Sequence, residues 1–105
     1  METIGNRTEI FRAKLNLETA QIPWKELQRF FAGGTALMVS ADLDLVEVAF
    51  QMAEDNVEQI QQWAAASHLG KVTEVQALEW LNNDALVWAV VVSPWVLVQY
   101  PGRLQ

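Results

Sequence analysis

The side chains that could do chemistry in this sequence are mainly carboxylates near its centre. Glu54 and Glu58 lie four residues apart and would share one side of a continuous helix, with Asp55 beside them. Asp42 and Asp44 precede them, so the oxygen ligands that a divalent cation needs are present. The spacing is not that of an EF-hand loop, and no Glu-x-x-His pair occurs. Helix caps and solvated helix faces explain these residues more simply, and we expect no metal site.

Motifs for nucleophilic or cofactor chemistry are missing from the sequence. His68 is the only histidine, and its neighbour Ser67 is adjacent in sequence, which is not by itself a nucleophile–base geometry. Without cysteine, neither a zinc site on one histidine nor thiolate chemistry is supported. The glycines form neither a P-loop nor a GxGxxG pattern, which argues against a nucleotide cradle. We therefore favour a non-catalytic protein over an enzyme and expect no cofactor.

Tryptophan is the other residue type with functional potential, because five of the 105 residues are tryptophan. Three of them, Trp63, Trp80 and Trp88, lie on stretches that we expect to face the core. Trp24 and Trp95 each follow a proline, and one of the two could reach the surface, where tryptophan is favoured in binding sites. The simpler alternative is that all five are structural aromatics of a small core. The candidate interaction surface consists of Trp24, Trp95, Glu54, Asp55, Glu58 and Gln62.

Composition and charge restrict the classes of partner. With 51% hydrophobic and 19% charged residues, the chain is typical of a globular protein, and its length predicts a single domain over residues 1–105. Residues 1–6 are expected to be a flexible N-terminal segment. The net charge is −6, and residues 41–84 carry nine carboxylates against Lys71 alone, a local charge of −8. This acidic block would repel phosphate backbones and anionic lipid, so we expect neither nucleic acid nor membrane partners.

The expected compartment follows from cysteine usage and the N-terminal sequence. The absence of cysteine fits a reducing compartment. The first fifteen residues, METIGNRTEIFRAKL, contain no apolar run of the kind that a secretory signal needs. These two features predict a cytoplasmic protein.

The most apolar stretch, ALVWAVVVSPWVLV at residues 85–98, predicts core strands. It is shorter than the roughly 20 apolar residues of a transmembrane helix, and Pro94 interrupts it. Valine dominates the stretch and favours strands, so we predict strands at 86–92 and 95–100 with a bend at Ser93-Pro94. Apolar residues on both sides suggest the centre of a sheet that includes a strand at 35–40. A partner-binding surface is the alternative interpretation.

Hydrophobic periodicity predicts helices in the rest of the chain. The first, at 8–18, would place Ile10, Phe11 and Leu15 near one face, and in the last, Val75 and Leu78 line up with Leu81. We expect Asp42 or Asp44 to cap the third helix and Asp55 or Asn56 to cap the fourth. Thr73 and Gln76 should form a capping box at the start of the last helix. A narrow polar stripe on the third helix predicts that this helix is central to the domain. The predicted helices cover 8–18, 23–32, about 44–54, 57–68 and about 73–82.

Together these elements predict an α+β fold with four to five helices around a small, mainly antiparallel sheet. The helices within residues 44–66 have the layout of a helix-turn-helix, and with strands at 35–40 and 86–100 the order resembles a winged helix. A DNA-binding version would carry basic residues on its second helix. Here the outer face of the second helix carries one carboxylate and three amide side chains and no basic residue, which argues against ordinary DNA binding. These residues are Glu58, Gln59, Gln61 and Gln62.

Several segments resemble a family of short bacterial proteins known as domain of unknown function 2288. The most specific are Ile22-Pro23-Trp24, the run from Leu45 to Asn56, and Pro94-Trp95 with the three residues after it. The resemblance covers about residues 8–100. It implies a stand-alone, small, cytoplasmic bacterial protein, and it implies no reaction, cofactor or catalytic residue.

Two functional hypotheses remain. The first is a non-catalytic protein-interaction or regulatory domain whose partner is another protein or a second copy, for example a homodimer formed by strand addition or helix packing. The alternative is a winged-helix nucleic-acid binder. It requires the N-terminal basic residues to gather beside the helix at 56–66. These residues are Arg7, Arg12, Lys14, Lys25 and Arg29.

Overall fold

The computed structural model describes residues 7–100, so the predicted flexibility of residues 1–6 lies outside the described residues. The described chain has five α-helices, one 3₁₀ helix (η1) and five strands, which confirms the α+β class. The elements are α1 (Arg7–Glu18), β1 (Ala20–Pro23), η1 (Trp24–Leu27), α2 (Gln28–Ala32), β2 (Ala36–Val39), α3 (Leu45–Ala53), α4 (Val57–Ala65), β3 (Leu69–Lys71), α5 (Glu74–Asn82), β4 (Leu86–Val92) and β5 (Trp95–Gln99).

The strands form one mixed sheet in the order β1-β4-β5-β2-β3. Strand β5 is parallel to β2, and the other three pairs are antiparallel. The predicted bend is the turn of a β4–β5 hairpin, in which Val92 pairs with Trp95 across a cis Ser93-Pro94 peptide. Strand β5 is the middle of the sheet, and Val96, Leu97 and Val98 are buried. The prediction of a central strand that is buried on both faces is therefore confirmed for β5.

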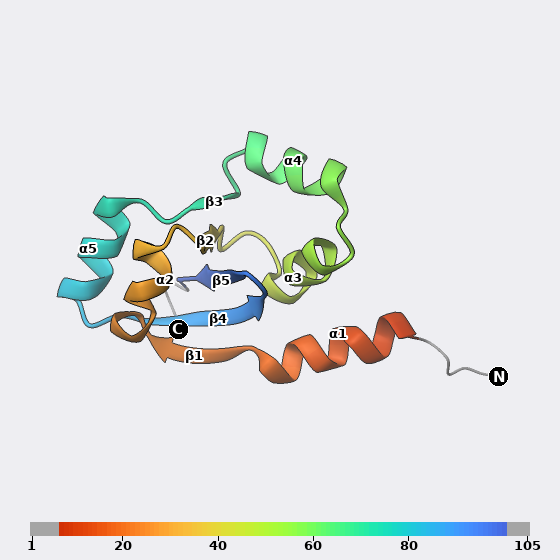
Figure 1. Cartoon of the computed structure of the whole chain (residues 1–105), viewed down its shortest axis with the longest axis horizontal. Coiled ribbons are helices and arrows are strands. Elements are labelled where there is room, and N and C mark those ends of the chain that lie inside the picture. The colour runs from red at the N-terminus through yellow and green to blue at the C-terminus, as the bar shows by residue number, and fades with distance from the viewer. Residues whose placement is uncertain (1–6, 101–105) are drawn as a thin grey trace.

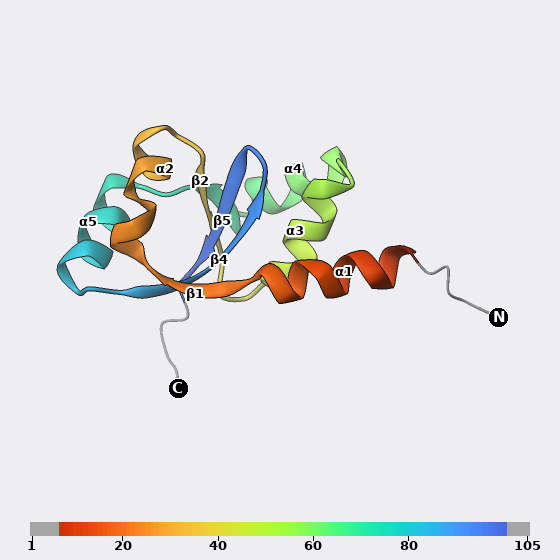
Figure 2. The same ribbon diagram turned by 60° about the horizontal axis from the view of Figure 1, so that its bottom comes forward.

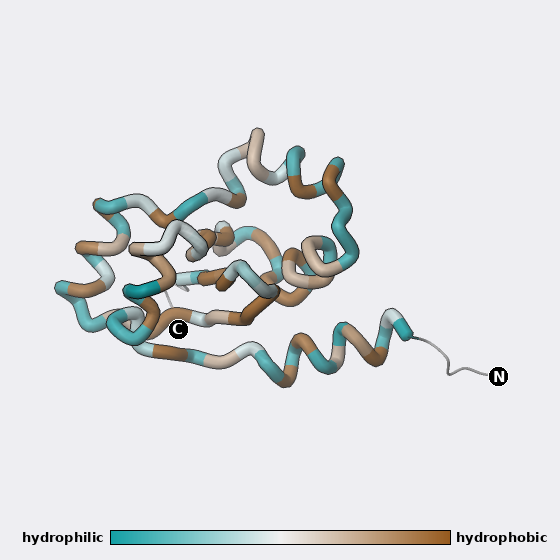
Figure 3. The backbone as a smooth tube through the Cα atoms, in the orientation of Figure 1, coloured by the Kyte–Doolittle hydropathy of each residue, from teal (hydrophilic) through white to brown (hydrophobic). Residues whose placement is uncertain are grey.

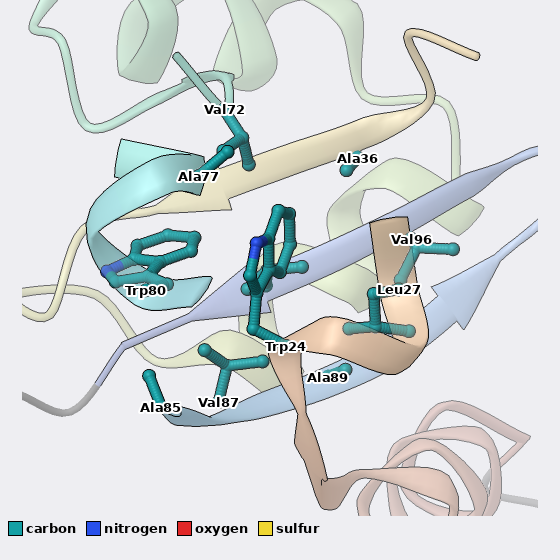
Figure 4. Close-up of a cluster of buried hydrophobic side chains, with 11 residues drawn as sticks. Trp24, Leu27, Ala36, Val72, Ala77, Trp80, Ala85, Val87, Ala89 and Val96 are labelled. Atoms are coloured by element: carbon teal, nitrogen blue, oxygen red, sulfur yellow. The ribbon is translucent and has the colours of Figure 1, made fainter. Parts of the chain in front are cut away.

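Helices cover both faces of the sheet (Figure 1, Figure 2). On one face, η1, α2 and α5 enclose a core cluster centred on Trp24, which is fully buried (Figure 4). The Trp24 ring meets the Trp80 ring edge-on, with 5.1 Å between their centroids, and this is a favourable geometry for two aromatic rings. The aromatic pair joins η1 to α5 and fixes both against the sheet.

The opposite face carries α1, α3 and α4 over a second core cluster. Val48 and Ala49 of α3 are fully buried there, together with Leu15 of α1 and Leu97 of β5. Helix α3 packs against α1, α4, β4 and β5. This agrees with the prediction of a central helix, because a helix with one narrow polar stripe can bury the rest of its girth.

The predicted helix caps are confirmed, and the structure resolves the alternatives. The Asp44 carboxylate accepts hydrogen bonds from the amides of Val46 and Glu47 at the start of α3. Asn56 rather than Asp55 caps α4, by accepting from the Gln59 amide. Thr73 and Gln76 form the predicted capping box of α5.

The helix predicted at 23–32 begins one residue later, and its first four residues form a 3₁₀ helix rather than an α-helix. Residues Ala20–Pro23 form the edge strand β1, which pairs with β4, and η1 separates this strand from α2. Pro23 has a ψ of 132°, so its backbone is extended rather than helical. Proline has no amide hydrogen to donate, and the sheet requires no donor at the end of an edge strand. Pro23 is therefore accommodated here as well as it would be in the first turn of a helix.

Several side chains that were expected in the core lie at the surface. Ile10 on α1 is largely exposed, and Trp88 on β4 is partly exposed. Helix α4 has no buried residue: Ile60 and Trp63 are half-buried, whereas Val57 is exposed. Helix α4 is consequently the most weakly embedded of the helices that cover this face.

The winged-helix resemblance is not confirmed. The two helices of the predicted helix-turn-helix exist, as α3 and α4, with a turn at residues 54–56. They pack on one face of a five-stranded sheet whose other face carries a second group of helices. The strands of the β4–β5 hairpin are inner strands of this sheet, flanked by β1 on one side and β2 on the other.

Candidate interaction surfaces

Helix α5 presents an apolar face to solvent, which we call the α5 stripe. Val75 is 76% exposed, Leu78 58% and Leu81 40%, whereas Ala77 and Trp80 on the other side of the helix are buried. Open hollows lie on both sides of Leu78, one bounded by Glu74 and the other by Glu79. The helix contains no basic residue. The α5 stripe is therefore an apolar surface with an acidic border.

Helix α1 carries a second exposed face, which we call the α1 stripe. It consists of Arg7, Ile10, Lys14 and Leu17, whose spacing of three, four and three places them along one side of a helix. Ile10 is 65% exposed and Leu17 84%. Hydrophobic and hydrophilic segments alternate along both α1 and α5, and the two helices lie at opposite ends of the molecule (Figure 3). The α1 stripe combines apolar side chains with two basic ones.

The inner side of α1 is tied to α3 by an ion pair between Arg12 and Glu47. The Arg12 guanidinium also lies 4.1 Å from the centre of the Phe50 ring. The hydrogen bond from Arg12 holds the pKa of the Glu47 carboxyl below its ordinary value, and a hydrogen bond from Gln51 adds to this lowering. The same hydrogen bond to Glu47 raises the pKa of Arg12.

The ion pair continues as a polar chain along α3 to the start of α4. Gln51 donates to Glu47 at 2.7 Å, and Asn56 donates to the Gln51 side-chain oxygen at 2.8 Å. Because Asn56 also caps α4, this chain fixes the turn at residues 54–56. Asp55 at the centre of that turn has a φ of 59°, in the left-handed region.

A pocket opens beside this turn, between the ends of α3 and α4 and the β4–β5 hairpin. Its volume is about 350 Å³. The residues of its wall are mostly apolar, and Asp55 is the charged one among those that the structure describes. The wall includes Met52, Asp55, Ile60, Leu69, Val92 and Trp95. We call this cavity the hairpin pocket.

The structure brings together two of the six predicted interaction residues, Trp95 and Asp55, in the hairpin pocket. Glu54 borders a different hollow, with Arg7 and Phe50. Glu58 and Gln62 are exposed on α4 and do not line the pocket.

Trp24 is a correction to the predicted interaction surface. It is completely buried on the opposite face of the sheet, so it cannot contact a partner. Of the two tryptophans that follow a proline, Trp95 is the one that reaches the surface, and it is half-buried.

Sequence reasoning missed the pocket residues Met52, Ile60 and Leu69. They come from three elements and look like ordinary core positions in the sequence. The only available signal was that α4 is less apolar than α3, which favours a looser contact between the two. The α5 stripe did carry a signal, since Val75, Leu78 and Leu81 recur at helical spacing.

Within residues 7–100, no group of three or more histidine or carboxylate side chains is arranged to hold a metal ion. Across the same residues no helix combines the length and the apolar character needed to cross a membrane. The described chain thus offers exposed surfaces and several hollows for recognition, among them the hairpin pocket. These features define the class: a small α+β domain whose single sheet is covered by helices on both faces.

The chain belongs to the family described as "Protein of unknown function (DUF2288)", whose model matches residues 10–100. The resemblance inferred from the sequence is thereby confirmed. The chain is also similar to PA1075 from Pseudomonas aeruginosa, a structure determined by NMR in solution, with 45% identity and a TM-score of 0.79. That match covers 98% of this chain and 95% of PA1075. None of the curated proteins matches.

Proposed function

We propose that the protein is a non-catalytic interaction domain that associates with further copies of itself through the α5 stripe. The observation that carries this proposal is the exposure of Val75, Leu78 and Leu81 on one face of a helix whose other face is fully packed. Exposed apolar residues that form a contiguous face, bordered by charge, are typical of protein-binding surfaces.

Charge selects the surface that docks on the α5 stripe. Packing one α5 against another would bring Glu74 and Glu79 of both copies together, and like charges in a contact are unfavourable. The complementary surface is an apolar helix face with basic residues. The α1 stripe has this composition, because Arg7 and Lys14 alternate with Ile10 and Leu17 along the helix.

The proposed contact is heterologous, because the α5 stripe of one copy meets the α1 stripe of the next. The two stripes lie at opposite ends of the molecule (Figure 1). A pair of copies in this contact therefore keeps one α1 stripe and one α5 stripe available for further copies. Repetition of such a contact produces open chains or rings rather than a closed dimer. One helix pair buries less than the roughly 800 Å² per partner of a stable interface, so the association is weak.

The nucleic-acid alternative loses the geometry that it required. Arg7, Arg12 and Lys14 lie on α1, whereas Lys25 and Arg29 belong to η1 and α2 on the other face of the sheet (Figure 2). Arg12 is paired with Glu47, and the Arg29 guanidinium lies 4.9 Å from the centre of the Phe30 ring. The five basic side chains therefore do not gather beside α4.

The proposal is tested by sedimentation velocity of the full chain over a wide concentration range. We expect the weight-average mass to rise with concentration, with no plateau at twice the monomer mass. Leu78→Glu places a charge within the α5 stripe and should keep the protein monomeric, while its circular dichroism spectrum stays that of the unmodified chain.

The matched control is Val91→Glu, which introduces the same charge at a residue that is 60% exposed on β4, outside both stripes. It should associate as the unmodified chain does. A chain that is monomeric at all concentrations, or equal losses of association in the two variants, would contradict the proposal.

A further inference from the structure

We infer that the hairpin pocket binds a small organic cation with an apolar body, such as an aromatic or branched aliphatic amine. This inference is independent of the proposed self-association, because the pocket lies on the α3–α4 side of the molecule and shares no residue with the α1 or α5 stripe. Three features of the pocket support it: its size, its apolar wall and the sign of the charge around its mouth.

The size of the hairpin pocket fits one small molecule. A volume of about 350 Å³ is within the range of ligand sites and corresponds to that of about a dozen water molecules. A single apolar side chain from a partner would leave much of it unfilled. Met52, Ile60 and Leu69 provide an aliphatic wall, and Trp95 adds an aromatic side chain. This wall suits the apolar body of a ligand.

The charge at the pocket specifies the polar group of the ligand. Asp55 lines the pocket, Glu54 and Glu58 are its near neighbours in the sequence, and no lysine or arginine occurs between Arg29 and Lys71. Lys71 is in β3, but its ammonium lies close to Gly34, after α2, rather than at the pocket. The Asp55 carboxylate would repel an anionic ligand and attract a cation, and Trp95 in the same wall supplies an indole ring, the side chain that cations favour most among the aromatics.

Asp55 is well placed to act without movement of the backbone. The Asn56–Gln51–Glu47 chain of hydrogen bonds fixes the turn on the α3 side, and the Val57 amide donates to the Asp55 carbonyl oxygen on the α4 side. The left-handed backbone of Asp55 also makes a clean variant possible, because asparagine tolerates this conformation as well as aspartate does. Asp55→Asn therefore removes the charge and keeps the turn.

The test is a titration of the ¹⁵N-labelled full chain with three probes of one shape: 2-phenylethylamine, 2-phenylethanol and 3-phenylpropionate at pH 7. We expect the protonated amine to shift the amide signals of Met52, Ile60 and Leu69 and the indole signal of Trp95. It should bind about two- to fivefold more tightly than the alcohol, which is the discrimination that one partly exposed charge contact provides. The carboxylate should not bind.

Asp55→Asn should reduce the preference for the amine over the alcohol to near unity. The matched control is Asp84→Asn, because Asp84 is also exposed and also has a positive φ, 52°, but lies beyond α5. This control should bind like the unmodified chain. The inference is overturned if the amine shifts no pocket signal at 10 mM, if amine and alcohol bind equally, or if both variants weaken amine binding to the same extent.

Discussion

At the scale of single residues, the buried Trp24 combines favourable and unfavourable contributions to stability. Its ring is fully buried and packs against Phe31 and Trp80, which stabilises the fold. Its indole Nε1 has no hydrogen-bond partner among the described residues. A buried donor without a partner costs about 1–3 kcal/mol, so part of the benefit of burying this ring is lost.

Replacing Trp24 by smaller side chains separates the two contributions. Trp24→Ala should lower the free energy of unfolding by about 3–5 kcal/mol, because a large cavity opens between η1, α5 and the sheet. Trp24→Phe should cost about 1 kcal/mol or less, since it removes the unpaired N–H while keeping a ring. Urea unfolding measures both losses. A loss of about 3 kcal/mol or more for Trp24→Phe would show that removal of the unpaired N–H offsets none of the lost packing.

Glu47 makes the stability depend on acid pH. Its folded-state pKa lies below the ordinary value of 4.5, chiefly because Arg12 donates a hydrogen bond to it. A lowered folded-state pKa stabilises the fold above pH 4.5, and this contribution is lost as the pH falls below 4.5 through the folded-state value.

Glu47→Gln should therefore lower the thermal midpoint modestly at pH 7 and have little effect at pH 3. Thermal unfolding between pH 3 and pH 7 measures the difference in midpoint between the variant and the unmodified chain. The control is Glu58→Gln, which removes one negative charge from an exposed residue. A difference for Glu47→Gln that stays constant across this range would show that the ion pair does not contribute to stability.

Residue patterns that act locally were predictable. The Asp44 and Asn56 caps and the Thr73–Gln76 capping box depend on side chains within three residues of the amides that they accept from. The burial of Trp24 and that of Trp95 could not be told apart, because a proline precedes each of them and burial depends on elements distant in the sequence. The hairpin pocket was unpredictable as a whole for the same reason, although two of its residues were singled out.

At the scale of elements, the hydrophobic pattern predicted which residues share a face but not where the face points. Val75, Leu78 and Leu81 line up as expected, yet α5 packs through Ala77 and Trp80, because the bulky Trp80 side chain reaches the Trp24 cluster. Strand β1 was missed because its four residues are extended only by pairing with β4, more than sixty residues later in the chain. The β4–β5 hairpin was recovered because valine content and Ser93-Pro94 are both local signals.

At the scale of the whole molecule, the arrangement leaves two complementary stripes at opposite ends. The sheet and its two helical layers bury the large apolar side chains of both core clusters. The same layers place the basic α1 stripe at one end and the acidic α5 stripe at the other (Figure 1). The self-association that we propose would need no conformational change, because both stripes are already exposed.

Charge reversal across the two stripes tests this central claim most directly. By sedimentation at low ionic strength, Lys14→Glu alone and Glu79→Lys alone should each weaken self-association several-fold, because like charges then face each other. The double variant Lys14→Glu/Glu79→Lys should restore the association to within about twofold of the unmodified chain, because the pair is again complementary. If the double variant associates no better than the two single variants, the α1 and α5 stripes do not meet and the account is wrong.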